Sequence, residues 1–306
     1  IEMRLPEAQG LYNPENEHDN CGIGFVAHIK GKPSNNIVQR GLEVLRNMDH
    51  RGATGADNST GDGAGLLMQI PHEFIVDVLK LNVGEQGKYG TGLVFLPKDE
   101  LEANVCIEIL SKHVASEGLT LLGYRDVPVD SSAPGEIAKT TEPTIKQIFI
   151  KANLEKDALE RKLYIVRKLA EKEVRESNLK FKSSFYQPSL SGKIIVYKGM
   201  FTPEQLRDYY LDFKDDKFKS AIALVHSRFS TNTFPTWDLA QPFRIVAHNG
   251  EINTVKGNRL WMQAREALMK SEVFGEDLKK LLPVIEPGKS DSASFDNVLE
   301  FLHLTG

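Results

Sequence analysis

The chain has 306 residues, of which 41% are hydrophobic and 26% charged, the balance of an ordinary soluble globular protein. Its formal net charge of −4 offers no positive field for a polyanion, so composition disfavours nucleic-acid binding. Two cysteines, Cys21 and Cys106, are too few for a disulfide framework or a four-sulfur metal site, which predicts a reducing, cytoplasmic setting. The chain contains no run of about 18 apolar residues, so we expect no membrane span.

Hydrophobic periodicity predicts a mixture of strands and helices along the chain. The predicted strands cover 23–30, 64–70, 91–97, 119–129, 144–152, 193–199, 220–230 and 243–251. The predicted helices cover 33–48, a short segment from Pro71, 98–118, 154–177, 203–212, 254–270 and 291–304. These elements do not alternate strictly as βαβ units, and several strands can pair as hairpins. We therefore predict an α+β fold with layered antiparallel or mixed sheets and helices outside them.

Residues 1–20 are acidic, polar and rich in Pro and Asn, and they lack the apolar core of a secretory signal. We interpret them as a flexible leader. After residue 20 no shift in composition marks a domain boundary, which predicts one large domain over 21–306. A helical pattern still runs at the last residues, so the chain is expected to be a piece of a longer protein.

Periodicity predicts which side of two helices is apolar. On the 98–118 helix we expect Leu101, Val105, Ile109 and Val114 to face the core, with Cys106 as a small buried hydrophobe. On the 291–304 helix the apolar positions are Phe295, Val298, Leu299 and Leu302.

Two familiar motifs are rejected on their context. The sequence GDGAGL within the glycine-rich loop 50–65 lacks the sixth glycine of a dinucleotide fingerprint, and it precedes a strand instead of a helix. His18 and Cys21 lack a second pair of ligands, so they do not form a zinc motif.

Cys21 stands where the leader ends and the first strand begins, with Gly22 and Gly24 beside it. A nucleophilic cysteine needs a base, which could be His226 or His248 at predicted strand ends. It could also be the α-amino group of Cys21 itself, if the leader is removed, because a free α-amine has a pKa of about 7.7–8.0. The position of Cys21 at the leader boundary favours the α-amine, although a buried structural cysteine would also fit.

Asn249 and Gly250 follow an apolar run, and their side-chain amide and backbone N–H could form an oxyanion hole. The simpler interpretation is an Asn-Gly hairpin turn. Arg228 could bind a carboxylate in a bidentate manner, or it could form a surface ion pair. Asp291 could bind a cationic amine, or it could cap the last helix.

Five segments together resemble the glutaminase domain of the class II, N-terminal-cysteine glutamine amidotransferases, and within that family the large subunits of glutamate synthases. They occur in the family's order, and they are CGIGFVA (21–27), HRGATGADNSTGDGAG (50–65), HSRFSTNTFPTW (226–237), AHNGEINT (247–254) and SDSASFDN (290–297).

The resemblance implies the four-layer αββα sandwich of N-terminal-nucleophile hydrolases and the hydrolysis of L-glutamine to glutamate and ammonia. It implies that the ammonia passes to a second site, which aminates 2-oxoglutarate. Carried over by position, Cys21 is the nucleophile, its freed amine is the base, and Asn249 with Gly250 forms the oxyanion hole. Arg228 would bind the α-carboxylate and Asp291 the α-ammonium of glutamine, and Arg51 would lie near the nucleophile.

Two departures from the family follow. The residues before Cys21 make its amine an amide, so the chain as written is expected to be an inactive precursor. The synthase region with its FMN and iron–sulfur cluster does not occur in the sequence, so we expect this chain to bind no cofactor and no metal. The last elements of the glutaminase domain are expected beyond Gly306. The implied partners are the remainder of the large subunit and a small electron-donating subunit.

Three other functions compete with this one. The chain could be a related N-terminal-nucleophile amidohydrolase acting on another amide, although Arg228 with Asp291 suits a free α-amino acid. It could be a catalytically silent module that binds glutamine and docks on a synthase. It could also be a Cys–His hydrolase that uses His226 or His248 and is active with the leader attached.

Overall fold

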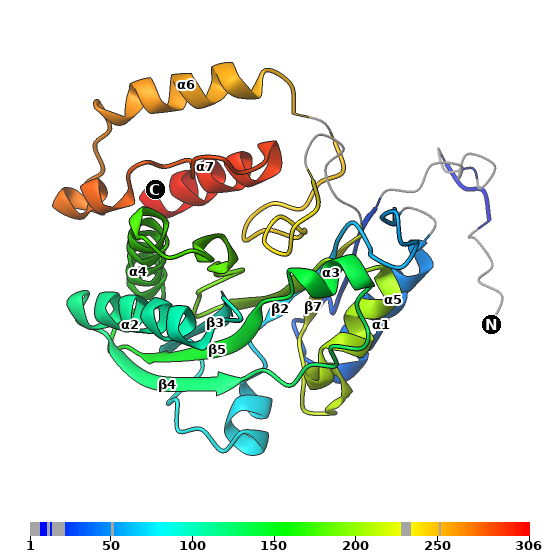
Figure 1. Cartoon of the computed structure of the whole chain (residues 1–306). Coiled ribbons are helices and arrows are strands. Elements are labelled where there is room, and N and C mark those ends of the chain that lie inside the picture. Colours follow the sequence, from blue (N-terminus) through cyan, green and yellow to red (C-terminus); the bar gives the residue numbers. More distant parts are fainter. Residues whose placement is uncertain (1–6, 11–12, 14–21, 50–51, 228–233, 251) are drawn as a thin grey trace.

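The computed structural model describes residues 7–10, 13, 22–49, 52–227, 234–250 and 252–306 (Figure 1). Four strands form one antiparallel sheet in the order β1 (Ile23–Ala27), β7 (Ile222–Ser227), β2 (Ala64–Gln69) and β6 (Ile194–Gly199). The register pairs Ile23 with His226 and Ala64 with Ser227. The start of β1, the end of β7 and the start of β2 therefore meet at one end of this sheet.

The second sheet has three antiparallel strands in the order β3 (Tyr89–Leu96), β5 (Thr144–Lys151) and β4 (Thr120–Asp126). Leu93, Phe95 and Phe149 of this sheet share one core with residues of the first sheet, while Val94 and Ile148 belong to a second core. Alternate residues of each strand thus serve different cores, as the period of two requires. The prediction of antiparallel sheets with helices is confirmed.

The helices lie mainly on the outer sides of the two sheets (Figure 1). α1 (Asn35–Asn47) packs against β1 and β7, and α2 (Glu100–Ser116) and α4 (Lys156–Glu176) pack against the second sheet. Figure 1 shows α6 (Val255–Glu266) and α7 (Asp291–Thr305) together at the α4 side of the molecule. The remaining helical segments are η3 (Phe74–Val78), α3 (Glu136–Thr140), η4 (Lys182–Ser184), α5 (Pro203–Tyr209), η5 (Leu211–Lys214) and η6 (Gly275–Leu281). No helix in the described part of the chain is long and apolar enough to cross a membrane.

The predicted buried side of α2 is only half right. Val114 is buried, but Leu101 is 77% exposed and Val105 also faces solvent. The core instead takes Ala103, Cys106 and Leu110. The helix carries a broad apolar arc, and packing against α4 and the sheet selects which part of that arc is covered. Cys106 is the buried hydrophobe that was predicted, and burial, followed by the nearby Glu102 carboxylate, raises the pKa of its thiol to about 11.

The predicted apolar side of α7 is right only in part, because Val298 and Leu299 are partly buried and Val298 packs against a core cluster. Phe295 and Leu302 are exposed, whereas the buried side of the helix carries Asp296, Asn297 and Glu300. Two arginines neutralise the buried carboxylates. Arg167 of α4 pairs with Glu300 and with Glu171, its Nη1 lying 3.0 Å from Glu171 Oε2. Arg244 lies 3.4 Å from Glu171 and 3.5 Å from Asp296. Pairing makes these charges tolerable in the interior.

The predicted strand at 243–251 does not form, and residues 243–250 are an irregular segment. The backbone N–H groups of Ile245 and Val246 both donate to Oδ1 of Asp296, at 2.8 and 3.1 Å. A carboxylate from α7 therefore satisfies the donors that a strand would have directed to a neighbouring strand. The apolar run FRIVA suggested a strand because the sequence does not show this distant acceptor.

Asp296→Ala should lower the free energy of unfolding by about 3–5 kcal/mol, because it leaves two backbone N–H groups without their acceptor and removes one of the two carboxylates that pair with buried Arg244. Asp296→Asn keeps an acceptor oxygen and should cost less. Urea unfolding followed by circular dichroism measures both. The control is Asp216→Ala at an exposed aspartate, which should change stability by less than about 0.5 kcal/mol. Equal effects at Asp296 and Asp216 would contradict the role of the buried carboxylate.

Candidate active site

Three of the predicted site residues, Cys21, Arg51 and Arg228, lie outside the described residues. Their chain neighbours Gly22, Gly52 and Ser227 are described, and the structure brings them together. Ser227 N donates to Gly22 O at 2.7 Å, which extends the β1–β7 pairing by one step. A Cβ placed on Gly52 would lie 3.4 Å from Ser227 Oγ. Segments separated by 30 and 175 residues thus converge at the shared end of β1 and β7.

The loop that runs from Gly52 to β2 is ordered by hydrogen bonds to Asp57. Asp57 accepts hydrogen bonds from Thr60 N at 2.8 Å, from Thr60 Oγ1 at 2.6 Å and from Ile137 N at 3.1 Å. These bonds, the Thr60 hydroxyl above all, hold the pKa of Asp57 well below its usual range. The loop then enters β2, as the sequence predicted when the dinucleotide motif was rejected. Its internal hydrogen bonds help to fix Gly52 beside Ser227.

Asn249 lies against the start of β1. A Cβ built on Gly22 would lie 3.5 Å from Asn249 Oδ1 and only 2.3 Å from Ser227 O. Gly22 is therefore needed for close backbone approach, and the residue that follows Cys21 sits beside the predicted oxyanion amide.

The Asn-Gly hairpin alternative is wrong. Within the described residues no strand pair flanks Asn249 and Gly250. The φ of Gly250 is not in the left-handed region that a two-residue hairpin turn requires. A Cβ on Gly250 would meet only His248 Nδ1 within 4 Å, at 3.9 Å. The space that a Cβ on Gly250 would occupy is therefore open, whereas the same space at Gly22 is filled by Ser227 O.

The two histidines are both engaged in holding this loop. His226 is buried, and its Nε2 lies 2.8 Å from the carbonyl oxygen of His248, which fixes the loop to β7. His248 receives Gly250 N–H at Nδ1, at 3.2 Å, and its Nε2 lies 2.9 Å from Ser292 Oγ. His226 Nε2 therefore donates to a carbonyl oxygen, and His248 Nδ1, the nitrogen that would have to serve as a base, already accepts a hydrogen bond.

Asp291 is the first residue of α7, and the helix cap is Ser290, whose Oγ accepts Ala293 N at 3.1 Å. The prediction that Asp291 itself could cap the helix is therefore wrong. Asp291 Oδ1 instead accepts Ser292 N at 2.6 Å and Ser292 Oγ at 3.2 Å.

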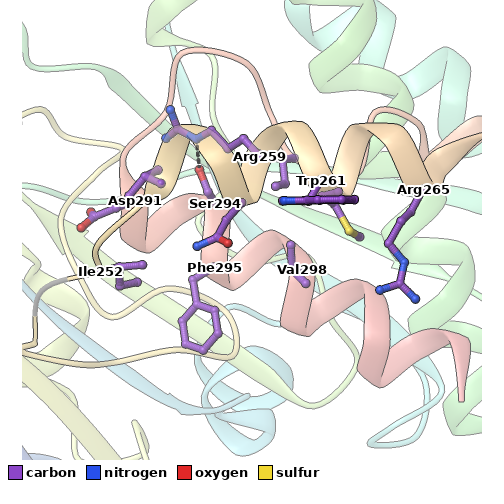
Figure 2. A pocket seen from close by; sticks show the side chains of 12 residues that line it. Ile252, Arg259, Trp261, Arg265, Asp291, Ser294, Phe295 and Val298 are labelled. Atoms are coloured by element: carbon purple, nitrogen blue, oxygen red, sulfur yellow. Dashed lines mark hydrogen bonds between the residues drawn. The ribbon is translucent and has the colours of Figure 1, made fainter.

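The N-terminus of α7 is fixed from the other side by α6. Figure 2 shows Arg259 reaching from α6, and its Nε donates to Ser294 Oγ at 2.9 Å. Its Nη2 donates to the carbonyls of Lys289 and Ser290. An apolar pocket of about 300 Å³ lies between the two helices, and Trp261, Met262, Phe295 and Val298 are among its lining residues. Asp291 is at its edge, with its carboxylate pointing away from Val298 in Figure 2. Asn249 and Gly250 do not line this pocket, so it adjoins the candidate site without containing it.

Sequence reasoning missed the residues that support the site. Asp296 lay within a quoted motif but received no role, and Gln241, whose Oε1 accepts His248 N at 3.0 Å, was not singled out. Only their polarity inside apolar stretches could have indicated them. Among the residues that the structure describes, no group of three or more His, Cys, Asp or Glu side chains could hold a metal ion.

Gly22→Ala and Gly250→Ala should behave differently. The Gly22 methyl would clash with Ser227 O and should cost about 1–3 kcal/mol of unfolding free energy. The Gly250 methyl enters open space, so its cost should stay below about 0.5 kcal/mol. Urea titrations of the two variants beside the parent chain measure this. Similar losses for both variants would show that the two glycines do not have the contrasting surroundings described above.

Comparison with known proteins gives a consistent result over the whole chain. The profile of the family described as glutamine amidotransferases class-II matches residues 21–306. The glutamate synthase (NADPH) large chain of Bacillus subtilis is 49% identical over 307 residues, which cover 99% of this chain and 20% of that protein. The glutamate synthase (NADH) of Saccharomyces cerevisiae is 46% identical over 99% of this chain and 14% of its own length. The ferredoxin-dependent glutamate synthase of rice is 43% identical over 100% of this chain and 19% of its own length. The chain thus spans about a fifth or less of these relatives.

Proposed function

Because the chain belongs to the class-II glutamine amidotransferases, we propose that it hydrolyses the side-chain amide of L-glutamine to glutamate and ammonia. The observation that carries the proposal is the position of Asn249, whose Oδ1 lies beside Gly22, the residue that follows Cys21. The side-chain amide of Asn249 therefore lies, through its oxygen, next to the start of β1, and this supports a role beside a nucleophile at residue 21.

In the proposed reaction the Cys21 thiol attacks the amide carbon of glutamine. The free α-amine of Cys21 takes the thiol proton and passes it to the amide nitrogen, which leaves as ammonia. The glutamyl group then remains on Cys21 as a thioester. Water then hydrolyses the thioester to glutamate. Asn249 and Gly250 stabilise the oxyanion of each tetrahedral intermediate, for which the Gly250 N–H must turn from His248 Nδ1 toward the substrate. Arg228 and Asp291 bind the α-carboxylate and the α-ammonium. We propose that Arg51 lies near the nucleophile. Its neighbour Gly52 lies beside Ser227, and Ser227 is hydrogen-bonded to Gly22, the residue after Cys21.

The α-amine is a better candidate for the base than either histidine. His248 Nδ1 already accepts the Gly250 N–H, and His226 is buried with its Nε2 donating to the His248 carbonyl oxygen. The amine of Cys21 exists only after the peptide bond between Asn20 and Cys21 is cleaved. We therefore propose that residues 1–20 are a leader and that the catalytic domain is 21–306.

The finer fold assignment and the cellular context belong to the same proposal. Helices on one side of each sheet and a core shared by both sheets support a four-layer αββα sandwich. The relatives named glutamate synthase support delivery of the ammonia to a synthase site that makes glutamate from 2-oxoglutarate. The proposed partners are the remainder of such a large subunit and a small electron-donating subunit. FMN and an iron–sulfur cluster would belong to that remainder, and the location would be cytoplasmic.

The first experiment is ammonia release from L-glutamine by the full chain and by a chain that begins at Cys21. We expect activity only in the trimmed chain, because only that chain has a free α-amine. Cys21→Ala in the trimmed chain should abolish turnover.

Each other result favours a different function. Equal activity with and without residues 1–20 would contradict the α-amine mechanism and favour a Cys–His hydrolase. Turnover of other amides in preference to glutamine would indicate a related amidohydrolase. Glutamine binding without ammonia release from the trimmed chain would indicate a silent binding module.

A further inference from the structure

One side chain of α6, Arg259, binds the backbone at the start of α7. Its Nε donates to Ser294 Oγ at 2.9 Å. Its Nη2 donates to the carbonyl oxygen of Ser290 at 3.0 Å and to that of Lys289. Figure 2 shows the Arg259 side chain directed toward the start of α7, where Asp291 and Ser294 lie. Residues 289 and 290 directly precede Asp291, so the guanidinium fixes the backbone that leads into this carboxylate.

The partners of Arg259 in the described part of the chain are two carbonyl oxygens and a hydroxyl, and none is a carboxylate. Helix stability by itself favours an anion, and not a cation, at a helix N-terminus. No residue of α6 is buried, so polar contacts are important in holding this helix. Arg259 supplies them toward one end, and Glu266, whose Oε1 accepts Val284 N at 2.8 Å, supplies one at the other. The charge of Arg259 is thus directed to the backbone before Asp291.

The same turn is held from a second direction by the side chain of Lys289. Its Nζ lies 2.5 Å from Oδ2 of Asp238, a largely buried carboxylate. The next residue, Ser290, caps the helix, and its Oγ accepts Ala293 N at 3.1 Å. The side chain of Lys289, the carbonyls of residues 289 and 290 and the cap of α7 are therefore all bound. These contacts restrict the turn to one position, and the position of Asp291 follows from it.

Asp291 lies beside the loop that carries Asn249, because its neighbour Ser292 has its Oγ 2.9 Å from His248 Nε2. Asp291 Oδ1 accepts Ser292 N at 2.6 Å and Ser292 Oγ at 3.2 Å. An ionised carboxylate has about four lone-pair sites, so these two hydrogen bonds within the helix orient the group without exhausting its capacity to accept from an ammonium. The orientation is useful only if the start of α7 itself is fixed, and that is the effect of the Arg259 contacts.

We propose that Arg259 is a positioning residue that fixes Asp291 for the α-ammonium group of the substrate, and that it thereby sets the preference for an amide with a free α-amino group. The inference rests on the proposed function, because it takes Asp291 as the ammonium-binding carboxylate. Arg259 itself contacts neither the substrate nor the reacting atoms. Without its hydrogen bonds the turn at 289–290 loses its link to α6, and the carboxylate is no longer held where the ammonium binds.

The test compares L-glutamine with glutaramate, which is glutamine without its α-amino group, in the chain that begins at Cys21. Arg259→Met keeps the apolar stem and removes every donor. It should lower kcat/KM for L-glutamine about 5- to 10-fold, mainly through KM, because the weakened pairing is charge-assisted. It should leave kcat/KM for glutaramate within about 2-fold, because that substrate has no ammonium to pair. Arg259→Lys keeps the charge without the planar fork and should retain part of the preference.

Asp291→Asn is the reference variant and Arg265→Met the matched control. Asp291→Asn should lower kcat/KM for L-glutamine about 10- to 100-fold and should not lower it for glutaramate. Adding Arg259→Met to it should change the result less than about 2-fold, because a positioning residue has no effect once its target is removed. Arg265 is an exposed arginine at the other end of α6 in Figure 2. Arg265→Met should leave both kcat/KM values within about 2-fold of the parent chain.

A smaller folded fraction lowers the turnover of both substrates equally, so their ratio separates positioning from stability. Equal losses for both substrates in Arg259→Met, or the ratio of the parent chain, would overturn the positioning role alone. An unchanged ratio in Asp291→Asn would overturn the assignment of Asp291 and this inference with it. Calorimetric binding of the two compounds to the same variants, combined with Cys21→Ala, needs no turnover. The expected pattern in binding, without ammonia release from the parent chain, would overturn the proposed hydrolysis and support the role of Arg259.

Discussion

Two buried arginines, Arg167 and Arg244, join parts of the chain that are distant in sequence. Arg167 on α4 pairs with Glu171 and with Glu300 of α7, and Arg244 pairs with Glu171 and with Asp296. Since a buried charge without its partner is strongly destabilising, these pairs define one arrangement of α4, α7 and the 243–250 segment. The segment that carries Asn249 and Gly250 depends on that arrangement, because Asp296 also binds its backbone.

The candidate site stands between two supports of different kinds. On one side the register of β1, β7 and β2 brings Gly22 and Ser227 together through backbone hydrogen bonds. On the other side the buried ion pairs and Arg259 of α6 fix the start of α7. His226 and His248 connect the two supports through the loop that carries Asn249.

Most of the strands and helices could be predicted from hydrophobic periodicity, with ends displaced by a few residues. The failures arise where a tertiary contact decides what the local pattern leaves open. The apolar run 243–251 predicts a strand, but the backbone donors of Ile245 and Val246 bind Asp296, which lies some 50 residues later in the chain. The apolar sides of α2 and α7 were misplaced because periodicity gives an apolar arc, and only packing decides which part of the arc is covered.

The sequence by itself determined the family and the candidate residues, because short motifs such as CGIGFVA and AHNGEINT need particular residue types at fixed spacing. It also determined that Cys106 is a core residue, because its neighbours are apolar at helical spacing. Only the tertiary structure decided which polar groups are buried together. The pairing of Arg244 with Asp296, and the link from Gly250 through His248 to Asp291, depend on contacts across more than 40 residues. Local patterns do not encode such contacts, since each partner alone looks like an ordinary surface charge or turn residue.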